Sequence, residues 1–187
     1  ELLTLVNKWY PLDESYAPEL SEESWLGEDF RVDRRCAEAL HAMLTDCMDA
    51  GCLPWVCSAY RDIEYQRDLF DNKILRVIDS GVRPSEAYDV AARSVAVPGT
   101  SEHHLGLAVD IVDYYYPDLT EYQEYTDTQQ WLMEHAWEYG FILRYPEEKT
   151  DITGITYEPW HYRYVGIEAA TYIRENNITL EEYLGKA

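Results

Sequence analysis

Two short segments hold three of the five histidines of this chain, together with carboxylates. The first reads SEHHLGLAVD from Ser101 to Asp110, and the second reads EPWH from Glu158 to His161. A fold that brings the two segments together would supply histidine and carboxylate groups to one site. Catalytic zinc takes three His or Asp/Glu ligands, keeps a fourth position for water and needs a nearby base. The composition of the two segments therefore predicts a mononuclear zinc hydrolase site.

The first segment offers a carboxylate, that of Asp110, in a strand-like stretch, and a choice of two histidines. His103 and His104 lie in a predicted turn before a strand-like stretch, and adjacent histidines cannot easily share one metal ion. Spacing alone does not choose between them. In the predicted strand 106–112, Asp110 points away from the bulkier apolar side chains that alternate with it. We therefore expect Asp110 and one of the two histidines to bind the metal.

The second segment offers one histidine and one further carboxylate. An isolated ExxH pattern is more often a solvated carboxylate and a strand histidine than a site. Here Pro159 stiffens the turn and the large indole of Trp160 seats it, which would hold Glu158 and His161 in a fixed relation. A general base must reach the metal-bound water without itself capturing the metal, and such rigidity serves that demand. We predict His161 as a ligand and Glu158 as the base.

Composition and charge limit the class of protein. A hydrophobic fraction of 47% with 14% aromatic residues excludes a disordered chain, and 187 residues suffice for one well-buried core. A formal net charge of -21 repels phosphate groups, so nucleic acid and anionic membrane surfaces are not expected partners. No apolar run is long enough to span a bilayer. Since the chain begins at Glu1 rather than Met, we expect any export signal or membrane anchor in a segment upstream.

The cysteines leave the compartment open. Cys36, Cys47, Cys52 and Cys57 lie close together in the sequence, and no CxxC pair occurs among them. They are therefore a poor match to a metal cluster. An even number of cysteines permits disulfides and an exported location, but four buried thiols in a reduced protein fit the same pattern.

The apolar pattern predicts a single α+β domain over 1–187, with an N-terminal arm at 1–30 and a catalytic core at 31–187. Helices gathered in the first half and strands in the second favour a central antiparallel sheet that carries the zinc site, with helices packed around it. The expected helices cover 33–50, 62–80, 84–95 and 126–140, with a short final helix capped by Thr179 and Glu182. The expected strands cover 2–8, 53–60, 106–112, 141–145, 152–157 and 162–165.

Beyond these two segments, the sequence resembles a known family over most of its length. SEHHLGLAVD and EPWH are similar to the patterns SxHxxGxAxD and ExxH of the zinc D-Ala-D-Ala carboxypeptidases and dipeptidases of the vancomycin-resistance type. Further matching stretches occur in the expected order, namely LVNK near the start, SAYRDIEYQ at 58–66, PGTSEH at 98–103, EHAWEYGFILRYP at 134–146 and ITGITYEPWHYRYVG at 152–166.

The resemblance assigns roles to individual residues. It implies that His103, Asp110 and His161 bind zinc, and it selects His103 over His104 because the family's histidine stands two positions after the serine. It also implies Glu158 as the general base and Arg61 as a group that binds or polarises the substrate near the scissile carbonyl. An arginine suits that role because its fork holds a carboxylate or a developing oxyanion. Gln66 and Ser101 are implied as substrate contacts.

The resemblance implies a peptidoglycan-processing carboxypeptidase that removes the C-terminal D-alanine from a cell-wall stem peptide, outside the cytoplasmic membrane. Three alternatives remain within the enzyme class: an L,D-carboxypeptidase acting on tetrapeptide stems, a D-Ala-D-Ala dipeptidase and an L-Ala-D-Glu endopeptidase. A non-catalytic wall-binding module of the same fold is the alternative from another class. The presence of Glu158 argues against that module, which would be expected to lose the base first. The sequence decides neither D,D against L,D specificity nor the oligomeric state.

Overall fold

The computed structural model describes residues 2–13 and 15–187, and its core is a four-stranded antiparallel sheet. The strand order is β3-β4-β6-β5, so β4 and β6, which are distant in the sequence, are neighbours at the centre. The strands are β3 Pro54–Ser58, β4 Ala108–Asp113, β5 Phe141–Leu143 and β6 His161–Tyr164. The predicted α+β class with a central antiparallel sheet is confirmed.

Two helices complete the main core around this sheet. Helix α1 (Arg34–Asp49) contacts β3, and α4 (Asp127–His135) contacts β4 and α1. Helix α1 begins at Asp33, whose side chain accepts a hydrogen bond from the backbone N–H of Arg35 and so satisfies one free helical donor. Apolar side chains from all of these elements form one buried cluster, including Leu40, Met43, Leu44, Val109, Ile111, Leu132 and Phe141.

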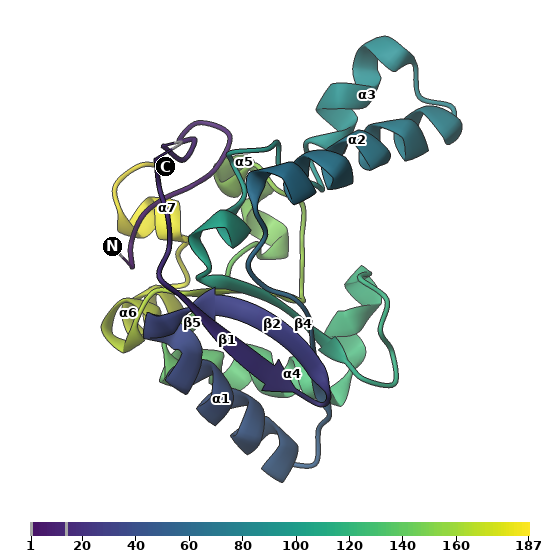
Figure 1. Ribbon diagram of the computed structural model, residues 1–187. Coiled ribbons are helices and arrows are strands. Elements are labelled where there is room, and N and C mark those ends of the chain that lie inside the picture. Colours follow the sequence, from purple (N-terminus) through teal and green to yellow (C-terminus); the bar gives the residue numbers. More distant parts are fainter. Residues whose placement is uncertain (1, 14) are drawn as a thin grey trace.

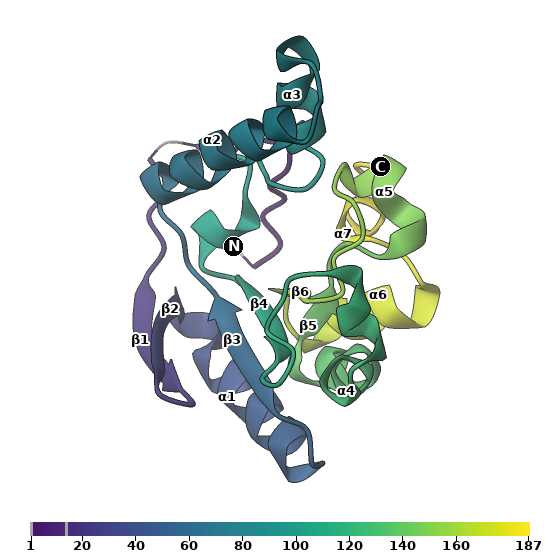
Figure 2. The same ribbon diagram turned by 90° about the vertical axis from the view of Figure 1, so that its right-hand side faces the viewer.

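A pair of helices projects from the body of the molecule. Helix α2 (Ile63–Asp79) begins close to the sheet and runs outward, and α3 (Pro84–Ala91) returns alongside it (Figures 1 and 2). The pair is held by a small core of its own, made of Phe70, Val77, Ala87 and Ala91. The predicted helix 84–95 is therefore shorter than expected, ending at Ala91.

The C-terminal part closes the side of the sheet next to β5. Helix α6 (Ile167–Asn176) packs on β5, and short helices α5 (Thr150–Thr153) and α7 (Leu180–Tyr183) lie nearby. The predicted capping box at Thr179 and Glu182 is present at the start of α7. Helix α6 was missed by sequence reasoning, although Ile167, Ala170 and Ile173 have helical spacing.

The N-terminal region differs from the expected strand and extended arm. Only an isolated bridge between Asn7 and Tyr10 occurs near the predicted strand 2–8. Strands β1 (Leu20–Trp25) and β2 (Glu28–Asp33) form a hairpin that spans the predicted boundary between arm and core. Its two loop residues, Leu26 and Gly27, have φ of +51° and +86°, as a tight hairpin turn of type I′ requires. The turn lacks the Asn-Gly signal that would have revealed it.

The predicted strand 152–157 is also wrong. Its first part belongs to α5, which ends where Gly154 adopts φ of +79°. The backbone N–H of Thr156 then donates to the carbonyl of Arg93, so this stretch joins the loop after α3 instead of the sheet. With α4 and α6 in the second half and the β1–β2 hairpin in the first, helices and strands are not separated along the chain as expected.

The structure answers the question that composition left open about the cysteines. Cys36, Cys47, Cys52 and Cys57 are all free thiols. Within residues 2–13 and 15–187, no helix is both long and apolar enough to cross a membrane.

Candidate active site

The sheet itself brings the two chemical segments together. Asp110 on β4 is paired directly with His161 on β6, so their side chains are cross-strand neighbours on one face. One carboxylate oxygen of Asp110, Oδ1, lies 2.9 Å from Nδ1 of His161. Both side chains are buried, at 3% and 4% exposure. Antiparallel pairing of β4 and β6 therefore forms half of the predicted site.

His103 comes from a short 3-10 helix, Glu102–Leu105, that precedes β4. Ser101 caps this helix, since its hydroxyl accepts a hydrogen bond from the backbone N–H of His103. Gly106 ends the helix with φ of +70°, and a Cβ there would lie 2.8 Å from the backbone nitrogen of Asp33. Only glycine avoids both the strained φ and the collision, so Gly106 lets the chain turn from His103 into β4.

The three predicted ligands meet at one point. Ligand atoms of His103, Asp110 and His161 all lie within 4.8 Å of one another, and all three residues are buried. Nδ1 of His103 lies 2.7 Å from the carbonyl of Ala59 and donates to it, which leaves Nε2 as the free lone pair. That Nε2 lies 3.3 Å from Oδ2 of Asp110. Two imidazole nitrogens and a carboxylate thus converge on one position.

His104 is directed elsewhere. Its Nδ1 lies 2.7 Å from the carbonyl oxygen of Arg61, and its Nε2 accepts a hydrogen bond from the backbone N–H of Gly99. Both ring nitrogens are therefore engaged by backbone, and His104 ties the loop before the 3-10 helix to the start of α2. The choice between the adjacent histidines follows from this geometry.

Glu158 lies beside the three ligands without joining them. Its Oε2 is 3.9 Å from Nδ1 of His161, and its side chain is 13% exposed. The backbone N–H of Glu158 donates to the carbonyl of Tyr145, and the carbonyl of Glu158 accepts from the N–H of His161. These bonds fix the turn that the Pro159-Trp160 pair was expected to stiffen. Glu158 thus has the position expected of a base.

Arg61 reaches the same place from the segment before α2. Its Nη2 donates to Oδ2 of Asp110 at 2.6 Å, and its Nε donates to the hydroxyl of Ser58 at 2.8 Å. Gln66, which is fully buried, accepts from Arg61 Nη1 at 3.4 Å and donates to the carbonyl of Ala96. Gln66 therefore supports Arg61 and the loop after α3, and its predicted contact with substrate stays a prediction, as does that of Ser101.

Burial and local charge separate the pKa values of these groups. Burial lowers the pKa of His103 to about 4, with the Arg61 charge adding to the effect, so the ring is neutral near pH 7. Burial opposes protonation of His161, but hydrogen bonds to Asp110 and Glu102 raise its pKa to about 9. Burial would raise the pKa of Asp110, yet His103 and Arg61 hold it well below its usual range.

The pKa of Glu158 moves in the opposite direction to that of Asp110. Burial raises the pKa of Glu158 to about 8, and the nearby Asp110 charge contributes while His161 opposes the shift. A carboxylate with a raised pKa holds a proton more strongly and is a better base and proton carrier near neutral pH. Two carboxylates with divergent pKa values therefore suit two roles, ligand and base.

Sequence reasoning missed the group behind His161. Glu102 is fully buried, and its Oε2 lies 3.6 Å from Nε2 of His161. Its Oε1 accepts from Nε of Arg144 and from Nη1 of Arg163, both also buried. Although burial opposes ionisation, these two arginines hold the pKa of Glu102 far below its usual range. The available signal was a glutamate directly before His103, together with one arginine directly after β5 and another within β6.

The arginines connect this group to both ends of the chain. Nη2 of Arg163 donates to the carbonyl oxygens of Leu2 and Thr4, and Arg144 forms a bidentate pair with Glu181 of α7. Both buried guanidinium groups thus have hydrogen-bond acceptors inside the protein, as buried charges require. The buried network places Glu102 rigidly against His161.

The site opens into a cavity of about 560 Å³ between α2, the loop after β4 and the turn before β6. Arg61, His103, Asp110, Glu158 and His161 all line it.

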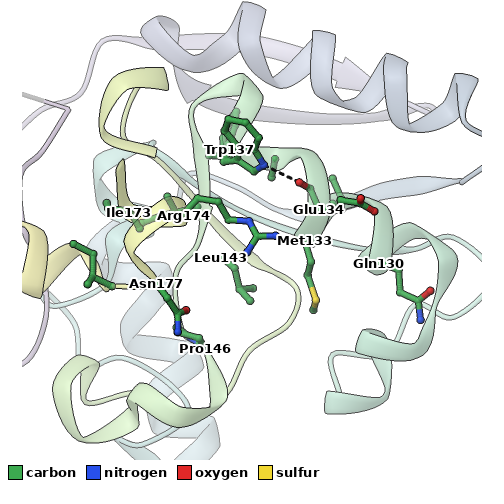
Figure 3. Close-up of a pocket in the computed structure, with 14 residues that line it drawn as sticks. Gln130, Met133, Glu134, Trp137, Leu143, Pro146, Ile173, Arg174 and Asn177 are labelled. Carbon is green, nitrogen blue, oxygen red and sulfur yellow. Dashed lines mark hydrogen bonds between the residues drawn. The ribbon is translucent and has the colours of Figure 1, made fainter. Parts of the chain in front are cut away.

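A second cavity of about 510 Å³ lies between α4, β5 and α6 and is mostly apolar, with Arg174 reaching toward Met133 and Leu143 (Figure 3). None of the predicted site residues lines this second cavity.

Known proteins are similar to this chain over almost its whole length. The family described as VanY, D-alanyl-D-alanine carboxypeptidase, matches residues 29–167. A D-alanyl-D-alanine carboxypeptidase of Enterococcus faecalis is 43% identical over 183 residues, which cover 97% of this chain and 65% of that protein. The chain therefore spans less than two thirds of that curated relative.

Two solved structures are similar in fold and sequence. The vancomycin-resistance D,D-pentapeptidase VanY from a VanB-type cassette, solved with Zn(II), has a TM-score of 0.88 and 43% identity, with 98% of each chain covered. The LD-carboxypeptidase LdcB has a TM-score of 0.84 and 37% identity, covering 98% of this chain and 85% of that one. From the family match and these identities, the chain belongs to the VanY family of D-alanyl-D-alanine carboxypeptidases.

Proposed function

We propose that this protein is a zinc-dependent D-alanyl-D-alanine carboxypeptidase that removes the terminal D-alanine from peptidoglycan stem peptides. The observation that carries the proposal is the convergence of His103, Asp110 and His161 on one point, with Glu158 beside them in the same cavity. The E. faecalis relative of the same name and the Zn(II) structure of VanY support it.

The residues present fit a zinc ion. Two imidazoles and one carboxylate are a ligand set that catalytic zinc commonly takes, and three ligands leave a coordination position open. Nε2 of His161 and Oε2 of Glu102 are buried without another hydrogen-bond partner among the described residues. If that Nε2 carries the proton and faces Glu102, Nδ1 is left as a lone pair directed at Asp110. This is the carboxylate–histidine arrangement that orients metal-bound imidazoles.

The chain's own groups then have distinct tasks. His103 Nε2, Asp110 and His161 Nδ1 would hold the ion, which when bound polarises a carbonyl and makes water more acidic. Oε2 of Glu158 would accept a proton from the attacking water and deliver it to the departing amine of D-alanine. Arg61, whose fork already reaches Asp110, would hold the scissile carbonyl or the terminal carboxylate of the substrate.

The proposed substrate places the enzyme outside the cytoplasmic membrane, where stem peptides of the cell wall are found. Its partner would be the peptidoglycan stem peptide. The Arg144–Glu102–Arg163 network is buried and contributes no surface to such a partner.

A direct test compares three substrates with the zinc-loaded protein: a pentapeptide stem ending in D-Ala-D-Ala, a tetrapeptide stem ending in one D-Ala, and free D-Ala-D-Ala. Mass analysis of the products should show loss of one alanine from the pentapeptide, slower or no cleavage of the tetrapeptide and little action on the dipeptide. Absence of any cleavage by the zinc-loaded protein would favour the wall-binding module.

An L,D-carboxypeptidase is the second candidate, because LdcB is 37% identical and has the same fold. In the same experiment, a preference for the tetrapeptide would establish that specificity, and rapid hydrolysis of the free dipeptide would indicate a dipeptidase. Each of these outcomes would leave the proposed roles of the zinc ligands and of Glu158 unchanged. The three reactions break a peptide bond in the same way and differ only in the shape of the pocket that selects the substrate.

A further inference from the structure

The active-site cavity extends well beyond the reacting groups, along helix α2. Four side chains of this helix after Gln66 line it, namely Leu69, Asn72, Lys73 and Arg76. At 1.5 Å per residue, Lys73 lies about 10 Å and Arg76 about 15 Å along the helix from Gln66. Because Gln66 contacts Arg61, the two cations form a wall of the cavity some distance from the catalytic centre.

Lys73 and Arg76 have no ion pair or side-chain hydrogen bond within residues 2–13 and 15–187. Arg67 of the same helix, which does not line the cavity, lies 3.6 Å from Glu64. The two cations on the cavity side are therefore available to a ligand.

The charges of α2 are divided between its faces. Its acidic side chains all lie away from the cavity, namely Glu64, Asp68, Asp71 and Asp79. The spacing of Gln66, Leu69, Lys73 and Arg76 places them on one side of a helix. On the opposite wall, Glu121 lines the cavity but is not within ion-pair distance of either cation. The cavity side of α2 thus carries positive charge in a strongly negative molecule.

We propose that Lys73 and Arg76 form a subsite for a carboxylate on the substrate peptide, amino-terminal to the scissile bond. The inference rests on the proposed function, because it takes the reacting peptide bond to lie beside Arg61 and Glu158. An extended peptide advances about 3.3 Å per residue, so about 10 Å corresponds to roughly three residues. In a stem peptide, the glutamyl residue joined through its γ-carboxyl lies at this distance and carries a free α-carboxylate.

A cationic subsite of this kind would select between two forms of the same peptide. The α-carboxyl of the γ-linked glutamyl residue can be free or amidated, and only the free form carries a charge. Lys73 and Arg76 can attract a carboxylate, and arginine can bind it in a bidentate manner. An amide offers neither interaction to the same extent. The structure therefore assigns to α2 a preference for the free acid.

The test uses two pentapeptides, L-Ala-γ-D-Glu-L-Lys-D-Ala-D-Ala and the same peptide with the glutamyl α-carboxyl amidated. The wild-type protein should cleave the free acid with kcat/KM about 5- to 20-fold higher, since a partly exposed charge-assisted contact is of that size. The Lys73→Ala/Arg76→Ala double variant should cleave both peptides equally. The difference should appear in KM, with kcat unchanged, because the contact is remote from the reacting bond.

Arg174→Ala is the matched control. Arg174 also lacks a side-chain partner among the described residues, but it lines the second cavity, and its loss should leave the preference intact (Figure 3). Calorimetric titration of both peptides into each protein gives a second readout that does not require cleavage. If wild-type protein binds and cleaves both peptides equally, or the double variant keeps the preference, the subsite is refuted. Peptides that bind with the expected preference but are not cleaved would refute the proposed activity alone.

Discussion

Oε2 of Glu102 and Nε2 of His161 face each other at 3.6 Å inside the protein, and neither atom has another hydrogen-bond partner among the described residues. The other oxygen of Glu102 is held by Arg144 and Arg163. Glu102 therefore presents one fixed acceptor to the far side of the His161 ring. With its proton on the nitrogen that faces Glu102, the ring of His161 would present Nδ1 to the proposed metal ion.

Replacing Glu102 with Gln should lower zinc affinity about 10- to 100-fold, the usual effect of losing such an acceptor behind a ligand histidine. Competition with a chromophoric chelator measures this change. Glu181→Gln is the matched control, because it disturbs the same arginine network through Arg144 without contacting His161. Both variants should lower the free energy of unfolding, but only Glu102→Gln should weaken zinc binding. Equal affinities in the two variants would assign Glu102 a purely structural role.

Replacement of His103 and replacement of His104 should have different effects on the zinc content of the protein. His103→Ala removes a ligand and should reduce bound zinc sharply from about one ion per chain. His104→Ala should keep the zinc but lower the free energy of unfolding by about 1–3 kcal/mol, because the backbone groups of Arg61 and Gly99 lose their partner. Metal content and denaturant unfolding of the purified variants test both statements. Comparable zinc loss in the His104 variant would contradict the assignment.

Glu158→Gln should retain the fold and the zinc but lose most of the activity. The amide cannot accept a proton, and removal of a general base typically lowers kcat by about 100- to 10,000-fold. Glu121→Gln is a suitable control, since Glu121 lines the same cavity but is not among the groups close to His161. A zinc-replete Glu158→Gln protein that works at the wild-type rate would eliminate Glu158 as the base.

The sequence predicted the residues that meet in the cavity, but it did not predict the buried groups that hold them in place. Asp110 was found because it points away from the bulkier apolar side chains of its strand, and His161 because Pro159 and Trp160 stiffen the turn before it. Their meeting depends on the pairing of β4 with β6, which joins residues about 50 positions apart and leaves no local signal. Glu102 was missed because its role comes from Arg144 and Arg163, which only tertiary packing brings to it.

The errors in the predicted fold also arise where the local sequence pattern does not determine the structure. The β1–β2 hairpin turns at Leu26-Gly27, where leucine adopts an αL conformation that its side chain disfavours and that sequence reasoning does not anticipate. The alternating stretch 152–157 lies in α5 and in a loop whose Thr156 bonds to the carbonyl of Arg93, and not in a sheet. The spacing of apolar residues therefore predicted the helices and strands that bury one regular face. It failed where the apolar residues lie in a loop.

Arg61 should depend on the geometry of its fork as well as on its charge. Arg61→Lys keeps a positive charge but loses the simultaneous contacts with Asp110 and Ser58. We expect kcat/KM to fall about 10- to 100-fold with zinc content unchanged, because an ammonium group cannot make a bidentate contact with substrate. Steady-state kinetics on the pentapeptide measure the change. Activity at the wild-type level in Arg61→Ala would show that the residue is structural.

Gly106 should be required for the close approach that it allows. Its φ is +70°, and an added Cβ would lie 2.8 Å from the backbone nitrogen of Asp33, whereas Gly51 has φ of +93° and nothing within 4 Å of a Cβ. Gly51→Ala therefore measures the cost of backbone strain alone, about 1 kcal/mol. Gly106→Ala should lower the free energy of unfolding by clearly more than that, because the backbone of Asp33 must move. It should also weaken zinc binding, since displacement of the turn shifts His103. Equal unfolding free energies and unchanged zinc affinity in the two variants would show that the close contact between Gly106 and Asp33 does not position the ligand.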